Sequence, residues 1–140
     1  YSPDEDRKEV KEFVAAYQKA YPGVQIKVPG NVYYNGYMAT RELLRAVERA
    51  GTTNNIKVIK ELENLKVPAR DRMQAYDAYM NPGTHQMQQT IYMATYNDAP
   101  TERDDIFRVL TQATPQEVED KDAPVACKLE SYEATSTYEQ

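Results

Sequence analysis

Apolar side chains recur every three to four residues near the start of the chain, with charged residues between them: Val10, Phe13, Val14 and Tyr17. This spacing is typical of one face of an amphipathic helix, and we predict a helix from Pro3 to Ala20. Ser2 followed by Glu5 has the pattern of a capping box, with proline at the first helical position. A proline–glycine pair ends the pattern.

Two further stretches with helical spacing follow. The first is predicted to begin near Tyr34 or Asn35 and to end at Gly51, because glycine is the usual residue just past a helix C-terminus. Its predicted buried side consists of Tyr37, Leu43, Leu44, Val47 and Ala50. The next helix is predicted to be capped by Thr53 or Asn54 and to end before a proline. Its predicted buried stripe consists of Ile56, Ile59, Leu62 and Leu65.

Alternating patterns also occur along the chain. Residues 24–28, VQIKV, are predicted to form a brief strand or an extended connector. Residues 87–94 alternate with the two-residue period of a strand. The turn sequence NPGT precedes them, so we predict a β-hairpin whose other arm runs from Gln74 to Met80.

The remainder of the chain predicts short helices. Thr101 is the predicted cap of a helix over residues 101–110, and Thr114 with Pro115 is the predicted start of another. The stretch after Asp122 is polar and irregular. We expect it to wrap a surface rather than to build a core.

The composition excludes several classes of function. The 140 residues include 17 Lys and Arg and 22 Asp and Glu, a net charge of −5 that is mixed along the chain. Without a basic stripe, nucleic acid is not an expected partner. No run approaches the about 20 apolar residues that a bilayer span requires. Twelve tyrosines without a tryptophan indicate many half-buried positions, where the ring is covered and the hydroxyl reaches a polar partner.

Residue types used in metal and nucleophilic chemistry are scarce. His85 is the sole histidine and Cys127 the sole cysteine, too few for a zinc site and without a recognisable nucleophile–base pair. Cys127 is expected to be a free thiol, to form an intermolecular bond, or to pair with a cysteine outside this chain. The glycines do not follow the dinucleotide-binding order. We therefore predict no enzymatic activity, no metal and no cofactor.

Four segments in order resemble one protein family. They are EVKEFVAAYQKAYPG, YYNGYMATRELLRAVERAGTTN, NIKVIKELENLKV and YMNPGTHQMQQTIYMATYND. Together they are similar to the C-terminal part of the substrate-binding proteins of ABC importers, most closely the branched-chain amino acid, amide and urea type. The similarity covers Asp4 to Asn97. It implies an α/β fold, the C-terminal portion of a two-lobed type I periplasmic-binding fold, helix-rich with a short strand and a β-hairpin.

The resemblance also implies an organisation and a role. Residues 1–97 would be a C-terminal lobe segment, and residues 98–140 an extension of short helices and irregular chain. The complete protein would be periplasmic, non-enzymatic and more than twice as long. Its two lobes would close on a small amino-acid-like or amide-type ligand, and the closed form would dock on an ABC permease.

The ligand-facing loop of the family matches Val32, Tyr33, Tyr34 and Asn35 in this sequence. Tyr34 and Asn35 are the preferred ligand contacts. An aromatic ring can cover an aliphatic group, and the Asn35 amide can hydrogen-bond a polar group or cap the helix. The same tyrosines can equally form a packed rim over the helix end.

A second reading is a structural or protein-interaction α/β domain whose tyrosines line an interface, where tyrosine is enriched. A piece of a larger fold would also expose core-type surface. We expect such surface to favour self-association of the chain.

Overall fold

A computed structural model of the chain describes residues 6–101, 103–123 and 129. The described part is a mixed α/β structure. Its helices and strands are α1 (Lys8–Ala20), α2 (Asn31–Ala50), α3 (Asn55–Glu63), β1 (Lys66–Val67), α4 (Ala69–Arg72), β2 (Ala78–Asn81), β3 (Gln86–Gln88), β4 (Ile91–Tyr96), β5 (Phe107–Ala113) and α5 (Pro115–Val118).

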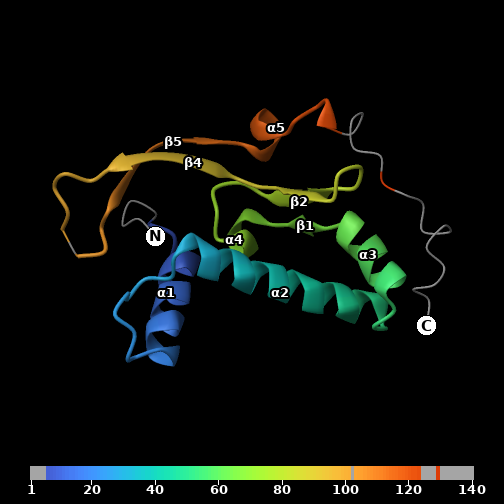
Figure 1. Cartoon of the computed structure of the whole chain (residues 1–140), viewed down its shortest axis with the longest axis horizontal. Coiled ribbons are helices and arrows are strands. Elements are labelled where there is room, and N and C mark those ends of the chain that lie inside the picture. The colour runs from blue at the N-terminus through green and yellow to red at the C-terminus, as the bar shows by residue number, and fades with distance from the viewer. Residues whose placement is uncertain (1–5, 102, 124–128, 130–140) are drawn as a thin grey trace.

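The long helix α2 runs beneath the strands, with α1 across one of its ends and α3 at the other (Figure 1). Strands β1, β2 and β3 form a small antiparallel sheet in that order. Strands β4 and β5 form a separate antiparallel ribbon that extends past the N-terminal end of α2. The connection between β4 and β5 therefore lies at one extremity of the molecule.

Helix α1 begins later than predicted. Its first residue is Lys8, and Asp6 and Arg7 are not helical, so the predicted start at Pro3 is wrong. The Asp6 carboxylate binds the Lys11 ammonium group rather than continuing the helix. The proposed capping residues Ser2, Pro3 and Glu5 lie outside the described residues.

Residues 24–28 form an irregular connector with bends at Gln25 and Val28, not a strand. The Gln18 side-chain amide donates a hydrogen bond of 3.0 Å to the Lys27 carbonyl, which holds this connector against α1. The connector returns the chain to the start of α2.

Helix α2 begins at Asn31, so the predicted start near Tyr34 or Asn35 is wrong. It ends at Gly51 as predicted, where a φ of 64° places the glycine in the left-handed region, which glycine adopts without strain. Its buried side was predicted wrongly. Tyr37, Leu43 and Leu44 are exposed, whereas Val47 and Ala50 are half-buried. The side that faces the rest of the molecule instead carries Met38, Glu42 and Ala46.

Glu42 can be buried on this side because neighbouring cations hold its carboxylate. Oε1 accepts hydrogen bonds from Arg41 Nε at 2.9 Å and from Arg45 Nη1 at 3.3 Å. A prediction from hydrophobicity assigns a glutamate to the solvent-facing side of a helix. It therefore predicted burial of the opposite side of α2.

Helix α3 is capped by Asn54, one of the two predicted caps: its Oδ1 accepts a hydrogen bond of 3.1 Å from the Lys57 amide. Ile56 is buried as predicted, and Val58 is also buried. Beyond the helix, a core cluster joins α3 to the sheet. It consists of Leu65, Val67 and Ala78, with Leu62, Met80 and Met87 packed against it.

The predicted hairpin is confirmed, but its first arm is Ala78–Asn81 and not the predicted Gln74 to Met80. Asn81 pairs with Gln86, and the Asn81 side chain accepts a hydrogen bond of 2.8 Å from the Gly83 amide in the turn. The predicted strand over residues 87–94 is divided, however, at Gln89 and Thr90. The buried Thr90 hydroxyl accepts a hydrogen bond of 3.0 Å from the Tyr76 amide, and the chain then leaves the sheet to enter β4.

The predicted helix over residues 101–110 is wrong. The Thr101 amide and hydroxyl both donate to Asp105 Oδ2, at 3.1 and 3.2 Å, and so close a turn instead of capping a helix. The chain continues as β5, in which Val109 pairs with Ala94. The following helix, α5, is confirmed with its capping box of Thr114 and Glu117.

Candidate ligand-binding site

A pocket of about 300 Å³ lies between α1, the first turn of α2, the segment after α4, and the β4–β5 ribbon. Most of its wall is apolar. The apolar side chains come chiefly from α1 and the ribbon: Val10, Phe13, Val14, Tyr92, Phe107 and Val109. An apolar concavity of this size suits a small solute rather than a macromolecule.

Tyr34 is the aromatic residue that α2 contributes to the pocket. Its hydroxyl donates a hydrogen bond to the Arg72 carbonyl, and its ring meets Phe13 edge-on with the centroids 6.3 Å apart. Burial raises the pKa of Tyr34 to about 12, against the opposing effect of the Arg72 cation. The phenol is therefore neutral near pH 7, and its ring is fixed as a wall of the pocket.

Gln74 is the most informative polar residue in the pocket wall. Met73 takes a left-handed conformation with φ 57°, and the Gln74 amide then donates 3.1 Å to the Ala69 carbonyl. The Gln74 residue is only 8% exposed. Its side-chain oxygen Oε1 is buried and has no hydrogen-bond partner among the residues that the structure describes. An unpaired buried acceptor costs about 1–3 kcal/mol.

Arg72 lies directly behind this wall. Its guanidinium carbon is 5.5 Å from the centre of the Tyr34 ring, a cation–π distance, and the group also donates to Gln89 Oε1. Desolvation lowers the pKa of Arg72 from its usual value, although the group remains a cation near pH 7. Together with the uncapped first turn of α2 at Gly30 and Asn31, it gives this side of the pocket a positive character.

The structure separates the four residues predicted to face a ligand. Tyr34 lines the pocket. Val32 and Tyr33 instead line a shallow groove on the outer side of α2, together with Tyr37 and Leu44. Asn35 is exposed and does not cap the helix, whose N-cap is Gly30. Their contact with a ligand stays a prediction.

Sequence reasoning missed Gln74 and the ribbon residues. The alternation of residues 87–94 places Tyr92 in a strand, but nothing local indicates that this strand faces α1. Gln74 lies in a stretch without clear periodicity, so the sequence carries no signal for its burial.

The other chemistry-bearing residues lie away from this pocket. His85 Nε2 is 2.9 Å from Glu63 Oε1, where the β2–β3 turn meets α3. Within residues 6–101, 103–123 and 129, no three His, Cys, Asp or Glu side chains gather in a way that could hold a metal ion. Cys127 lies outside the described residues.

In the described part of the chain, no helix is both long and apolar enough to cross a membrane. Comparison with curated proteins and with solved structures found no match. Comparison with protein families matched residues 1–101 to the model described as periplasmic binding protein. The match covers most of the chain, and the chain therefore belongs to the periplasmic binding protein family.

Proposed function

We propose that the protein is the solute-binding component of an ABC importer and that the pocket beside Tyr34 holds part of its ligand. The family is typically one of non-enzymatic binding proteins, and its membership suggests a solute-binding role on the extracytoplasmic side. The observation that carries the assignment to this pocket is Gln74, which lines an otherwise apolar cavity and whose buried side-chain oxygen has no partner among the described residues.

The wall chemistry favours a small ligand with an N–H donor and an aliphatic or aromatic body. Gln74 Oε1 can accept from an ammonium or amide N–H group. The rings of Phe13 and Tyr34 cover apolar surface, and Asn31 supplies a further polar group at the pocket edge. An amino-acid-like or amide-type solute meets these requirements.

Ligand binding would favour closure of the two lobes. A ligand shifts a conformational equilibrium only by its differential affinity for the two states, so it must contact both lobes in the closed form. The closed form would then dock on the permease. Because this chain supplies one side of such a cleft, we expect it to bind weakly by itself, with a Kd of about 1 mM, equivalent to roughly −4 kcal/mol.

Titration of the ¹⁵N-labelled chain with leucine and with isobutyramide, followed by NMR, tests the proposal. We expect saturable shifts of the Gln74 side-chain amide and of backbone amides around Asn31 and Ala94, which line the pocket. Gln74→Met, which keeps the length of the side chain, should weaken binding about fivefold through the loss of one hydrogen bond of about 1 kcal/mol.

Gln112→Met is the matched control, because Gln112 is exposed on β5 and does not line the pocket. It should leave binding unchanged. Saturable shifts that map to another surface, or equal effects of the two variants, would contradict the assignment to this pocket.

A further inference from the structure

The chain after β5 is fastened to one face of the small sheet. Tyr79 and Asn81 stand two residues apart on β2, so their side chains project from the same face, opposite to Ala78 of the core cluster. Both side chains meet Glu119, the residue that directly follows α5. Figure 1 shows α5 on the side of the strands that lies away from α2. Glu119 therefore joins the chain after α5 to a strand that comes 40 positions earlier.

Two donors hold the Glu119 carboxylate, one on each oxygen. The Tyr79 hydroxyl donates to Oε2 at 2.6 Å, and the Asn81 side-chain amide donates to Oε1 at 2.6 Å. The Asn81 amide is oriented independently, because its Oδ1 accepts from the Gly83 amide at 2.8 Å and its Nδ2 is left to face Glu119. Hydrogen bonds to an ionised acceptor are stronger than those between neutral groups. The bond to Glu119 also raises the pKa of Tyr79 to about 12, so the phenol keeps the proton that it donates at neutral pH.

The segment between β5 and Glu119 is short and braced by its own hydrogen bonds. Strand β5 ends at Ala113, and the capping box of Thr114 and Glu117 starts α5. Pro115, the first residue of α5, is buried, and its carbonyl accepts a hydrogen bond of 3.0 Å from the Glu119 amide. Because this segment is braced, the position of Glu119 determines where the C-terminal end of β5 lies.

Strand β5 supplies part of the pocket wall. Phe107 and Val109 line the pocket from β5, as Tyr92 does from β4. Strand β4 has a fastening of its own, since the Tyr92 hydroxyl accepts a hydrogen bond of 2.9 Å from the Ala75 amide. Strand β5 pairs with β4 and continues into α5. Its pocket residues lie beyond residues 1–101, the range of the family match, so the family assignment gives no expectation for them.

We propose that Glu119 is a positioning residue for the pocket. By binding Tyr79 and Asn81, it fixes the C-terminal end of β5. It thereby keeps the wall that β5 supplies, Phe107 and Val109, in place against the rest of the pocket. A two-stranded ribbon is marginal by itself in water, so its fixed points decide how firmly it keeps its position. The contact of this wall with a solute rests on the proposed function, whereas the fastening of β5 does not.

NMR order parameters of the ¹⁵N-labelled full chain test the fastening without any solute. Glu119→Met keeps the length of the side chain and removes both acceptors. It should lower the order parameters of the β5 amides from about 0.85 toward about 0.6 and leave those of α2 at about 0.85. Asp122→Asn removes one negative charge from an exposed residue of the same segment and should change neither set. A lower global stability alone would not move the order parameters, so β5 amides that stay equally rigid in Glu119→Met overturn the proposal.

Glu119→Gln distinguishes the two hydrogen bonds from simple packing. Its amide oxygen can accept from Asn81 while its NH₂ group donates to the Tyr79 oxygen, so both contacts can persist as weaker neutral bonds. The order parameters of β5 should therefore lie between those of the native chain and those of Glu119→Met. Equal losses in the Gln and Met variants would overturn the proposal, because the hydrogen bonds would then not be the cause.

Tyr79→Phe examines the same contact from the sheet side and removes a single hydroxyl group. It should lower the order parameters of β5 in the native chain. It should have no further effect in Glu119→Met, since the hydroxyl has already lost its acceptor there. An additive loss in the double variant would mean that the two residues act separately, and it would overturn the proposal.

Titration with leucine connects the fastening to the pocket. A wall that is in place for only part of the time lowers the binding-competent fraction, and the apparent Kd rises by the inverse of that fraction. Glu119→Met should raise the Kd at least about threefold, and Asp122→Asn should leave it unchanged. A mobile β5 with an unchanged Kd would overturn the positioning role.

The two proposals fail separately. If neither leucine nor isobutyramide produces saturable shifts in the native chain, the proposed function fails, while the order parameters still decide whether Glu119 holds β5. If β5 is equally rigid with and without the Glu119 carboxylate, Glu119 has no positioning role, whatever the native chain binds.

Discussion

Tyr34 and Arg72 contact each other in two ways: the Tyr34 hydroxyl donates to the Arg72 carbonyl, and the Arg72 guanidinium carbon lies 5.5 Å from the centre of the Tyr34 ring. The two residues are 38 positions apart in the sequence. Their contact joins the first turn of α2 to the C-terminal end of α4. It thereby fixes two adjacent parts of the pocket wall, Tyr34 itself and the segment that carries Gln74.

The burial of Tyr34 predicts a loss of stability at alkaline pH. The pKa of Tyr34 is raised to about 12, whereas an unfolded chain releases the phenolic proton near its usual value of about 10. The unfolded state therefore binds fewer protons than the folded state between these values, and the free energy of unfolding falls as pH rises from about 10 to about 12. Below pH 10 this contribution is fully present.

Tyr34→Phe should make that fall shallower and should cost about 1 kcal/mol near pH 7 through loss of the hydrogen bond. The slope should not vanish. Hydrogen bonds to Tyr21 and to Glu119 also raise the pKa values of Tyr33 and Tyr79 to about 12. Urea unfolding at several pH values measures both effects. Tyr96→Phe, at an exposed ring, is the control, and an equal change of slope in both variants would count against burial of Tyr34 as the cause.

Removal of the Gln74 amide should stabilise the ligand-free protein. Gln74→Met keeps the volume of the side chain while it deletes the buried oxygen that has no partner in the described structure. We expect the free energy of unfolding to rise by about 1 kcal/mol, since an unpaired buried acceptor is removed. Thermal or urea unfolding measures it. A decrease of similar size would mean that Oε1 has a partner in the folded chain.

Substitutions at two adjacent residues, Thr53 and Asn54, test which of them caps α3. Asn54→Ala should lower the free energy of unfolding by about 1 kcal/mol, because the Asn54 side chain accepts from the Lys57 amide. Thr53→Ala should have an effect within about 0.5 kcal/mol, as is usual for surface substitutions. The reverse order in urea unfolding would place the helix start one residue earlier.

Gly51 provides a test of backbone conformation alone. Its φ is 64°, and an added Cβ would meet no atom within 4 Å, so the cost of a side chain there is conformational. Gly51→Ala should lower the free energy of unfolding by about 1–2 kcal/mol. Gly51→Asn should lose less, because asparagine tolerates the left-handed region. Equal losses for the two substitutions would point to a steric cause.

Features set by local chemistry were predictable from the sequence. Gly51, the Asn54 cap, the turn at Asn81 and the Thr114 capping box each depend on residues within four positions of one another. Such signals need no knowledge of the rest of the chain. They predicted the end of α2, the starts of α3 and α5, and the presence of the hairpin.

Features that depend on contacts between distant parts of the chain could not be predicted from the sequence. The segment after Thr101 carries a helix-like start, yet Phe107 pairs with Tyr96 and the chain extends as a strand. The apolar pattern of α2 selects Leu43 and Leu44, but burial follows Met38 and Glu42, because the arginines neutralise that glutamate. The pocket itself joins α1 to a ribbon that starts over seventy residues later, so no local pattern could indicate it.

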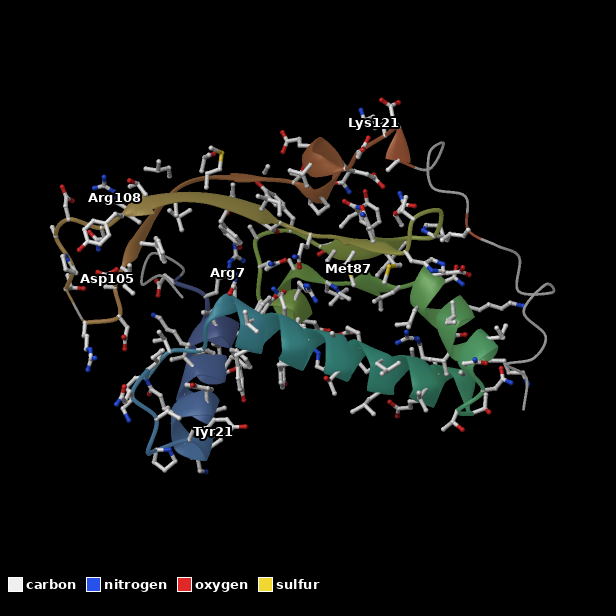
Figure 2. All side chains as sticks on the ribbon, viewed as in Figure 1. Arg7, Tyr21, Met87, Asp105, Arg108 and Lys121 are labelled. Carbon is white, nitrogen blue, oxygen red and sulfur yellow. The ribbon has the colours of Figure 1, made fainter. Side chains whose placement is uncertain are left out.

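The ribbon of β4 and β5 forms one wall of the pocket, and it is also the least supported part of the described structure. Its strands pair with each other and with no other described strand, and their register shifts between Met93 and Ala94. Side chains project from both faces of the ribbon, whose outer end lies near Asp105 and Arg108 (Figure 2). A two-stranded ribbon is marginal by itself in water.

Amide hydrogens of the ribbon should consequently exchange with solvent faster than those where β1 and β2 pair beside the Leu65 cluster. We expect the same compliance to let the proposed solute enter as the ribbon bends outward, while Tyr34 and Arg72 keep the opposite wall in place.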